Sequence, residues 1–195
     1  ASYINDGKHT YNGLKIDESG VVVGLGSYDL RKTGGHLLIP NGVSGIDANA
    51  FSGIKAIKSV TIPLTISSIG EWAFADCSIL EVNFVSSKFE YTKYVHGYSS
   101  NISVRYGLDN MTDQLSTIET GAFSGCRKLK SIEIPYTVTS IGDAAFSDCQ
   151  ALSKVTFNHV EPVLDYIGAD AFNGCSALKI VAIPESVTTA DDAFN

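Results

Sequence analysis

The feature that most constrains this chain is an Ala-Phe dipeptide that recurs six times at nearly regular spacing. The phenylalanines are Phe51, Phe74, Phe123, Phe146, Phe172 and Phe194. The intervals between them are 23, 49, 23, 26 and 22 residues, and we interpret the longest interval as two coils, one of them atypical. A period of this length predicts a solenoid, in which each coil buries its apolar residues only by stacking on its neighbours.

Each Ala-Phe lies in a frame that combines two periodicities. A Cys and a Leu follow the Phe at three-residue intervals, as Cys126 and Leu129 follow Phe123, which predicts a short helical turn on one side of the coil. The next residues alternate, so that Ile132 and Ile134 share one face and predict a short strand. Stacked coils would place these strands in a parallel sheet and equivalent side chains in ladders.

Composition and charge narrow the functional classes. The 195 residues are 44% hydrophobic and 18% charged, with 18 glycines, which suits a single compact domain. The formal net charge is -7 and no run of Lys or Arg that could track phosphates occurs, so we expect no nucleic-acid partner. No apolar stretch is long enough to cross a membrane, and the first residues lack the layout of a signal peptide.

The repeated frame, Ile-Gly-x-x-Ala-Phe-x-x-Cys-x-x-Leu-x-x-Val/Ile-x-Ile-Pro, resembles the BspA-like, or Treponema-type, leucine-rich repeat. The resemblance covers about residues 37–195. It implies an α/β solenoid, a right-handed leucine-rich-repeat superhelix with short parallel strands on the concave side and short helical turns on the convex side. It also implies an extracellular or cell-surface bacterial protein whose relatives mediate attachment to host proteins or other cells.

We expect one continuous domain, with an N-terminal β cap at residues 1–36 and the solenoid at 37–195. In the cap, alternating residues flank Asp17 to Gly20 and predict a β-hairpin that covers the first coil. Within the solenoid, Ile54 replaces the Cys of the first repeat, and the strand that begins at Leu80 is one residue short. The last frame stops at Asn195, which leads us to expect a fragment of a longer protein.

The segment at about residues 85–115 breaks the repeat and is either an insertion or a degenerate coil. Its aromatic and basic side chains are of the kind enriched at protein contacts and able to stack on sugar rings. The alternative is that these aromatics cap a widened core and bind nothing. The candidate partner-binding residues, which include two from the outward strand face, are Phe89, Tyr91, Tyr94, Tyr98, Arg105, Tyr106, Glu133 and Lys154.

The four cysteines, Cys77, Cys126, Cys149 and Cys175, all lie three residues after a repeat Phe. Because an Ile fills this position in the first repeat, we predict buried free thiols, although spacing leaves disulfides between adjacent coils open. The histidines are scattered and no Cys-x-x-Cys pair occurs, so we predict no metal site and no cofactor.

Catalysis needs converging groups, such as a nucleophile with a base or paired carboxylates, and no such pattern is visible in the sequence. We therefore predict a protein that is not an enzyme, a leucine-rich-repeat scaffold for protein binding or adhesion. The expected partner is a protein, such as a host or extracellular-matrix protein. The alternative is a glycan bound by the aromatic segment.

Overall fold

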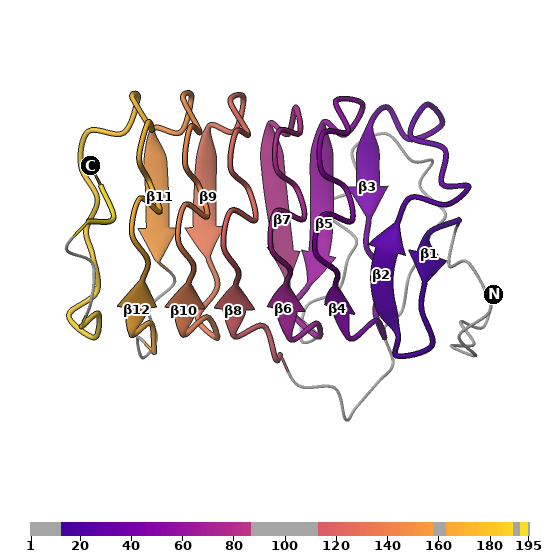
Figure 1. Ribbon diagram of the computed structural model, residues 1–195, viewed down its shortest axis with the longest axis horizontal. Coiled ribbons are helices and arrows are strands. Elements are labelled where there is room, and N and C mark those ends of the chain that lie inside the picture. The colour runs from indigo at the N-terminus through magenta and orange to yellow at the C-terminus, as the bar shows by residue number, and fades with distance from the viewer. Residues whose placement is uncertain (1–12, 87–112, 158–162, 189–191, 195) are drawn as a thin grey trace.

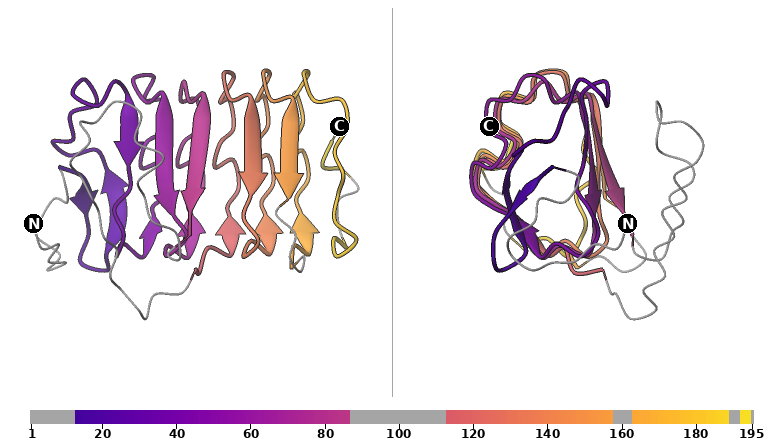
Figure 2. Two further views of the ribbon diagram at one scale, coloured as in Figure 1. Left: turned by 180° about the vertical axis from the view of Figure 1, so that it is seen from behind. Right: turned by 90° about the vertical axis from the view of Figure 1, so that its right-hand side faces the viewer.

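The computed structural model describes residues 13–86, 113–157, 163–188 and 192–194. The chain winds into coils that stack along one axis (Figure 1), and a view along that axis shows successive coils superposed around a single core (Figure 2). This arrangement confirms the predicted solenoid of stacked coils. No helix in the described part of the chain is long and apolar enough to cross a membrane.

In the described residues, twelve short strands form two of the three walls of the coils, and segments around the repeat Phe form the third. The strands are β1 Lys15–Ile16, β2 Val21–Gly24, β3 His36–Leu38, β4 Gly45–Ile46, β5 Ser59–Pro63, β6 Ser68–Ile69, β7 Glu81–Val85, β8 Thr117–Ile118, β9 Ser131–Ile134, β10 Ser140–Ile141, β11 Lys154–Phe157 and β12 Tyr166–Ile167. We name the walls the long-strand wall (β3, β5, β7, β9, β11), the short-strand wall (β4, β6, β8, β10, β12) and the turn wall (the Phe segments).

The N-terminal hairpin is present as predicted. Strands β1 and β2 pair antiparallel, and Asp17 stabilises the turn between them because its Oδ1 accepts the N–H groups of Ser19 and Val21 at 2.8 and 3.0 Å. Strand β2 then pairs in parallel with β4. The hairpin therefore continues the short-strand wall into one seven-stranded sheet, which runs from β1 to β12.

The prediction of helical turns in the Phe segments is wrong, because residues on both sides of each Phe from Phe51 to Phe172 have left-handed backbone conformations. Two residues before Phe146, Ala144 has φ 53°, and two residues after it Asp148 has φ 57°. Such residues end any helix. The N–H of Phe146 instead donates to Ala171 of the next coil at 2.8 Å. The turn wall is thus a hydrogen-bonded ladder between coils and contains no helix in the described residues.

The repeat phenylalanines form one continuous stack, which also corrects our interpretation of the 49-residue interval. The rings of Phe74 and Phe123 lie 5.3 Å apart with an interplanar angle of 6°, as close as Phe123 and Phe146 at 5.4 Å. Strand β6 likewise pairs directly with β8. No extra coil therefore separates these two repeats, and the additional residues leave the stack on another side.

The long-strand wall is where the stack is interrupted. Its strands form a three-stranded sheet, β3-β5-β7, and a two-stranded sheet, β9-β11, with no ladder between β7 and β9. The interruption falls where the chain passes from residue 86 to residue 113. In the same region the shortened repeat places Ile79 in the buried Leu position, and Leu80 is 45% exposed.

Candidate binding surface

The outward face of the long-strand wall differs between its two sheets. Glu133 on β9 and Lys154 on β11 are exposed, and the register places them beside Thr156 and Ser131 respectively. On β5 the outward Thr61 is only 1% exposed. Of the candidate residues, Glu133 and Lys154 therefore lie on an accessible strand face. The others, Phe89, Tyr91, Tyr94, Tyr98, Arg105 and Tyr106, lie outside the described residues.

The sequence analysis missed a polar cluster that connects β3 to β5. His36 Nδ1 lies 2.7 Å from Ser59 Oγ, and its Nε2 lies 3.0 Å from Thr61 Oγ1. Burial lowers the pKa of His36, while the charge of Glu81 on β7 acts to raise it. Both imidazole nitrogens thus contact hydroxyl groups, and no carboxylate orients the ring as in a catalytic triad. The cluster cross-links two strands. His36 and Ser59 occupy equivalent positions in successive repeats, so an alignment of the repeats would have predicted their contact.

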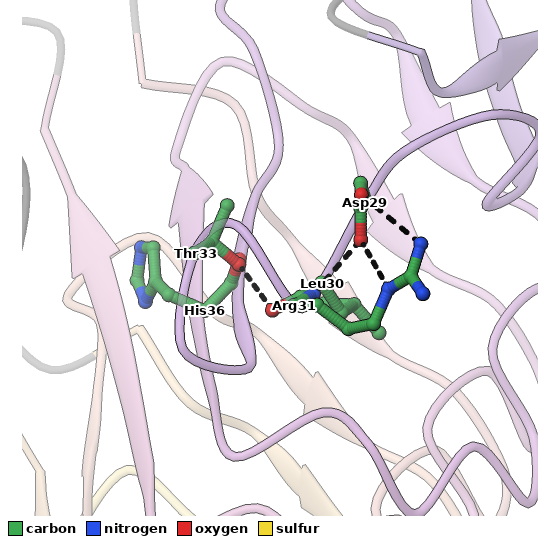
Figure 3. A network of polar contacts seen from close by, with 5 residues as sticks. All are labelled: Asp29, Leu30, Arg31, Thr33 and His36. Carbon is green, nitrogen blue, oxygen red and sulfur yellow. Dashed lines mark hydrogen bonds and ion pairs between the residues drawn. The ribbon is translucent and has the colours of Figure 1, made fainter.

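The loop that leads into β3 is held by its own polar contacts (Figure 3). Thr33 Oγ1 lies 3.1 Å from the carbonyl of Leu30 and 2.6 Å from that of His36. At the outer side of the loop, Arg31 Nε donates to Asp29 Oδ1 at 3.1 Å, and this hydrogen bond lowers the pKa of Asp29. The contacts fix the start of β3 and hold a charged loop at the corner of the first coil.

A second polar cluster joins Ser86 and Asp113, the residues on either side of the segment 87–112. Asp113 Oδ2 accepts the hydroxyl of Ser86 at 2.6 Å and the hydroxyl of Tyr136 at 2.6 Å. The hydrogen bond to this carboxylate, together with burial, raises the pKa of Tyr136 to about 12. We call these three residues the clasp, because they hold residues 86 and 113 close together against the following coil.

All four cysteines are buried and free, as predicted. Each thiol donates to the carbonyl of the Phe in the preceding coil, for example Cys77 to Phe51 at 3.1 Å and Cys126 to Phe74 at 3.2 Å. Burial raises the pKa of Cys77 to about 11 and moves that of Cys126 in the same direction. The thiols are therefore packing groups that satisfy backbone acceptors in the core.

Comparison with known proteins identifies the repeat. The profile of the BspA type leucine rich repeat region matches residues 34–106 and 108–195 in six copies. No curated protein matches the sequence.

Among solved structures, the chain is similar to a leucine rich cell surface protein of Faecalibacterium prausnitzii, with 28% identity and a TM-score of 0.55 over 74% of this chain and 31% of that one. It shares the fold of the pneumococcal vaccine antigen PcpA, with 19% identity and a TM-score of 0.61 over 91% and 50% of the two chains. A leucine rich repeat protein of T. pallidum has 22% identity and a TM-score of 0.57 over 81% and 60%. The chain thus spans less than two thirds of each of these structures.

Proposed function

Because the chain belongs to the family of BspA type leucine rich repeat proteins, we propose that it is a non-enzymatic scaffold at the bacterial cell surface that binds a protein partner. The observation that carries the proposal is the interruption between β7 and β9. The repeat core continues past this point without change, and an aromatic-rich segment leaves and rejoins it at the clasp. A rigid scaffold that holds one divergent segment is a common design for binding.

We assign the partner-binding role to the candidate residues of the insertion, with Glu133 and Lys154 as a secondary contact. Tyrosine and phenylalanine supply large contact areas at a small cost in side-chain entropy, and they dominate the energetics of many protein interfaces. The same aromatics favour a glycan as the second candidate partner, since aromatic rings stack on sugar rings. The similar cell surface protein of F. prausnitzii supports a surface location for this chain.

The test compares three proteins on immobilised extracellular-matrix proteins and on a glycan array. The first is the parent chain. The second lacks residues 87–112 and joins Ser86 to Asp113 through Gly-Ser, which the short distance between their side chains permits. The third carries Glu133→Gln and Lys154→Gln on an otherwise intact chain.

We expect the parent to bind a matrix protein and the deletion variant to lose that binding with an unchanged circular dichroism spectrum. Binding to the glycan array alone would select the second candidate. Full binding by the folded deletion variant would contradict a role for the insertion, and a loss confined to the double variant would move the site to β9 and β11.

A further inference from the structure

The coils gather most of the described cations on one edge of the solenoid. This edge consists of the connections from the turn wall to the long-strand wall, which enter β3, β5, β7, β9 and β11 along the upper border of Figure 1, together with the equivalent segment after Phe172 in the last coil. Nine of the ten described Lys and Arg residues lie on these connections or on the first strand residue after them, but only four of the sixteen described carboxylates do. A chain of net charge -7 therefore has a cationic edge and strongly acidic remaining surfaces.

We define the basic edge by its exposed cations, other than Lys154 on β11, that have no described carboxylate within ion-pair distance. They are Lys32, Lys55, Lys58, Arg127, Lys128, Lys130 and Lys179. In the described part of the chain, the ammonium groups of Lys55 and Lys58 donate to backbone carbonyls, Lys58 Nζ to that of Lys55 at 3.0 Å. Arg31, at the same edge, is the cation that pairs with a carboxylate, that of Asp29. The other charges are thus available to an external anion.

The cations follow a period of two coils. Lys58, Lys130 and Lys179 occupy the same frame position, seven residues after Phe51, Phe123 and Phe172. The two coils between them carry Leu80 and Ser153 at this position, as the bond from Ser153 N–H to Lys130 at 2.9 Å confirms for the second. The rings of the Phe stack lie 5.2 to 5.4 Å apart from coil to coil, so successive cationic coils are on the order of 10 Å apart. The result is a row of charge along the solenoid axis.

A row of this kind favours a linear polyanion over other charged partners. Single-stranded nucleic acids bind through aromatic stacking platforms, and duplex DNA is bound by an element that enters a groove. The basic edge has no exposed aromatic side chain among its described residues and is a single line of flexible cations, mostly lysines. Between the cationic coils, Gln150 and Ser153 are exposed and polar, which suits sugar hydroxyl groups.

We propose that the basic edge binds an acidic polysaccharide. The ammonium and guanidinium groups pair with its sulfate or carboxylate groups, and Gln150 and Ser153, in the coil between Lys130 and Lys179, contact its hydroxyl groups. The inference goes beyond the proposed function, because it uses none of the residues in the insertion or on the outward face of β9 and β11. In the sequence Lys58, Lys130 and Lys179 are separated by 72 and 49 residues, and the stacked coils bring them into one row.

Heparin is the probe, and its affinity is measured by calorimetry at several salt concentrations. We expect binding to weaken roughly fifty-fold between 50 and 200 mM salt, as four neutralised charges predict by analogy with single-stranded polyanions. The edge variant carries Lys58→Gln, Lys130→Gln and Lys179→Gln and should bind at least tenfold more weakly. The variant without residues 87–112 should bind heparin like the parent, which separates this inference from the proposed function.

Two controls distinguish heparin binding at the basic edge from a general effect of the protein's net charge. Lys15→Gln removes a cation of the N-terminal hairpin and should leave heparin affinity unchanged. Adding Glu18→Gln, Glu71→Gln and Glu185→Gln to the edge variant restores the parent's net charge at exposed positions away from the edge, and binding should stay weak. Recovery of binding in that protein, no heparin binding by the parent, or equal affinity for a single-stranded DNA of the same charge would each overturn the proposal.

Discussion

The turn wall and the long-strand wall respond differently to the same irregularity in the sequence. Between Phe74 and Phe123 the turn wall continues without a gap, since the ring stack and the bond from Phe74 N–H to Ala122 at 2.8 Å match those of other coils. In the long-strand wall the ladder stops between β7 and β9. One wall therefore maintains the stack, and the other can accept additional residues without loss of the fold.

The physical reason is the kind of contact that each wall makes. In the turn wall, a ring stack and left-handed residues recur in the coils from Phe51 to Phe172, and four of these five coils add a buried thiol. In the long-strand wall, neighbouring strands share mainly a ladder and an alternating apolar face. A gap in such a ladder costs a few hydrogen bonds, each worth about 1 kcal/mol net, because the other walls still hold the coils together.

The largest expected effect on stability comes from removing an aromatic ring of the turn wall, compared with removing one of the long-strand wall. Phe123→Ala opens a cavity in the middle of the stack and should lower the free energy of unfolding by about 3–5 kcal/mol. Phe84→Ala on β7 is the matched control, because Phe84 is half-buried beside the interruption, and its loss should be less than half as large. Both values come from denaturant unfolding, and equal losses would contradict the difference between the walls.

Two glycine substitutions in the turn wall should have smaller effects, and they separate the cost of backbone strain from the cost of crowding. Gly53 and Gly125 occupy the same frame position, with φ of 74° and 70°. A Cβ at Gly53 meets nothing within 4 Å, whereas a Cβ at Gly125 would lie 2.2 Å from Asp76 Oδ1. Gly53→Ala should therefore cost about 1 kcal/mol from strain alone, and Gly125→Ala about 2–3 kcal/mol.

Adding Asp76→Gly to Gly125→Ala tests the source of the difference. The second substitution removes the crowding carboxylate and permits the left-handed conformation of residue 76, so the double variant should recover stability to the level of Gly53→Ala. A double variant as unstable as Gly125→Ala would show that the side chain of residue 76 does not determine the cost.

The sequence predicted the solenoid, the hairpin and the buried thiols because each depends on a local pattern that repeats. It predicted helical turns wrongly, since the three-residue spacing of Phe, Cys and Leu fits both a helix and the observed turns. The left-handed residues decide between them, and at this position Ala144 and Trp72 carry no local signal for such a conformation. The 49-residue interval was misjudged because spacing alone does not show on which wall extra residues leave the coil.

The candidate sites show the same limit. Residues of the insertion stand out because they break the repeat, and their role stays a prediction. The His36 cluster, the clasp and the basic edge depend on contacts between residues at least 22 positions apart, such as His36 with Ser59 and Ser86 with Asp113. Aligning the repeats would predict the row of lysines, but not the clasp, whose partners occupy no repeated position.

The smallest expected effect concerns the clasp on the interrupted side. Asp113→Asn keeps the shape of the side chain but weakens its hydrogen bonds to Ser86 and Tyr136, and it should lower the free energy of unfolding by about 1 kcal/mol. It should also return the pKa of Tyr136 from about 12 towards 10, measured by the absorbance of ionised tyrosine. Asp47→Asn, at an exposed position of the turn wall, is the control and should leave this titration unchanged.

The sign of the accompanying pH effect follows from the direction of the shift. A folded-state pKa above the unfolded value means that the contribution of Tyr136 to stability is present below pH 10 and is lost as pH rises from 10 to about 12. Buried Cys77, with its pKa raised to about 11, adds a loss that begins near pH 9. Asp113→Asn should remove only the tyrosine component, so the parent and variant should converge in stability as pH approaches 12. A constant difference across this range would mean that the clasp does not couple Tyr136 to Asp113.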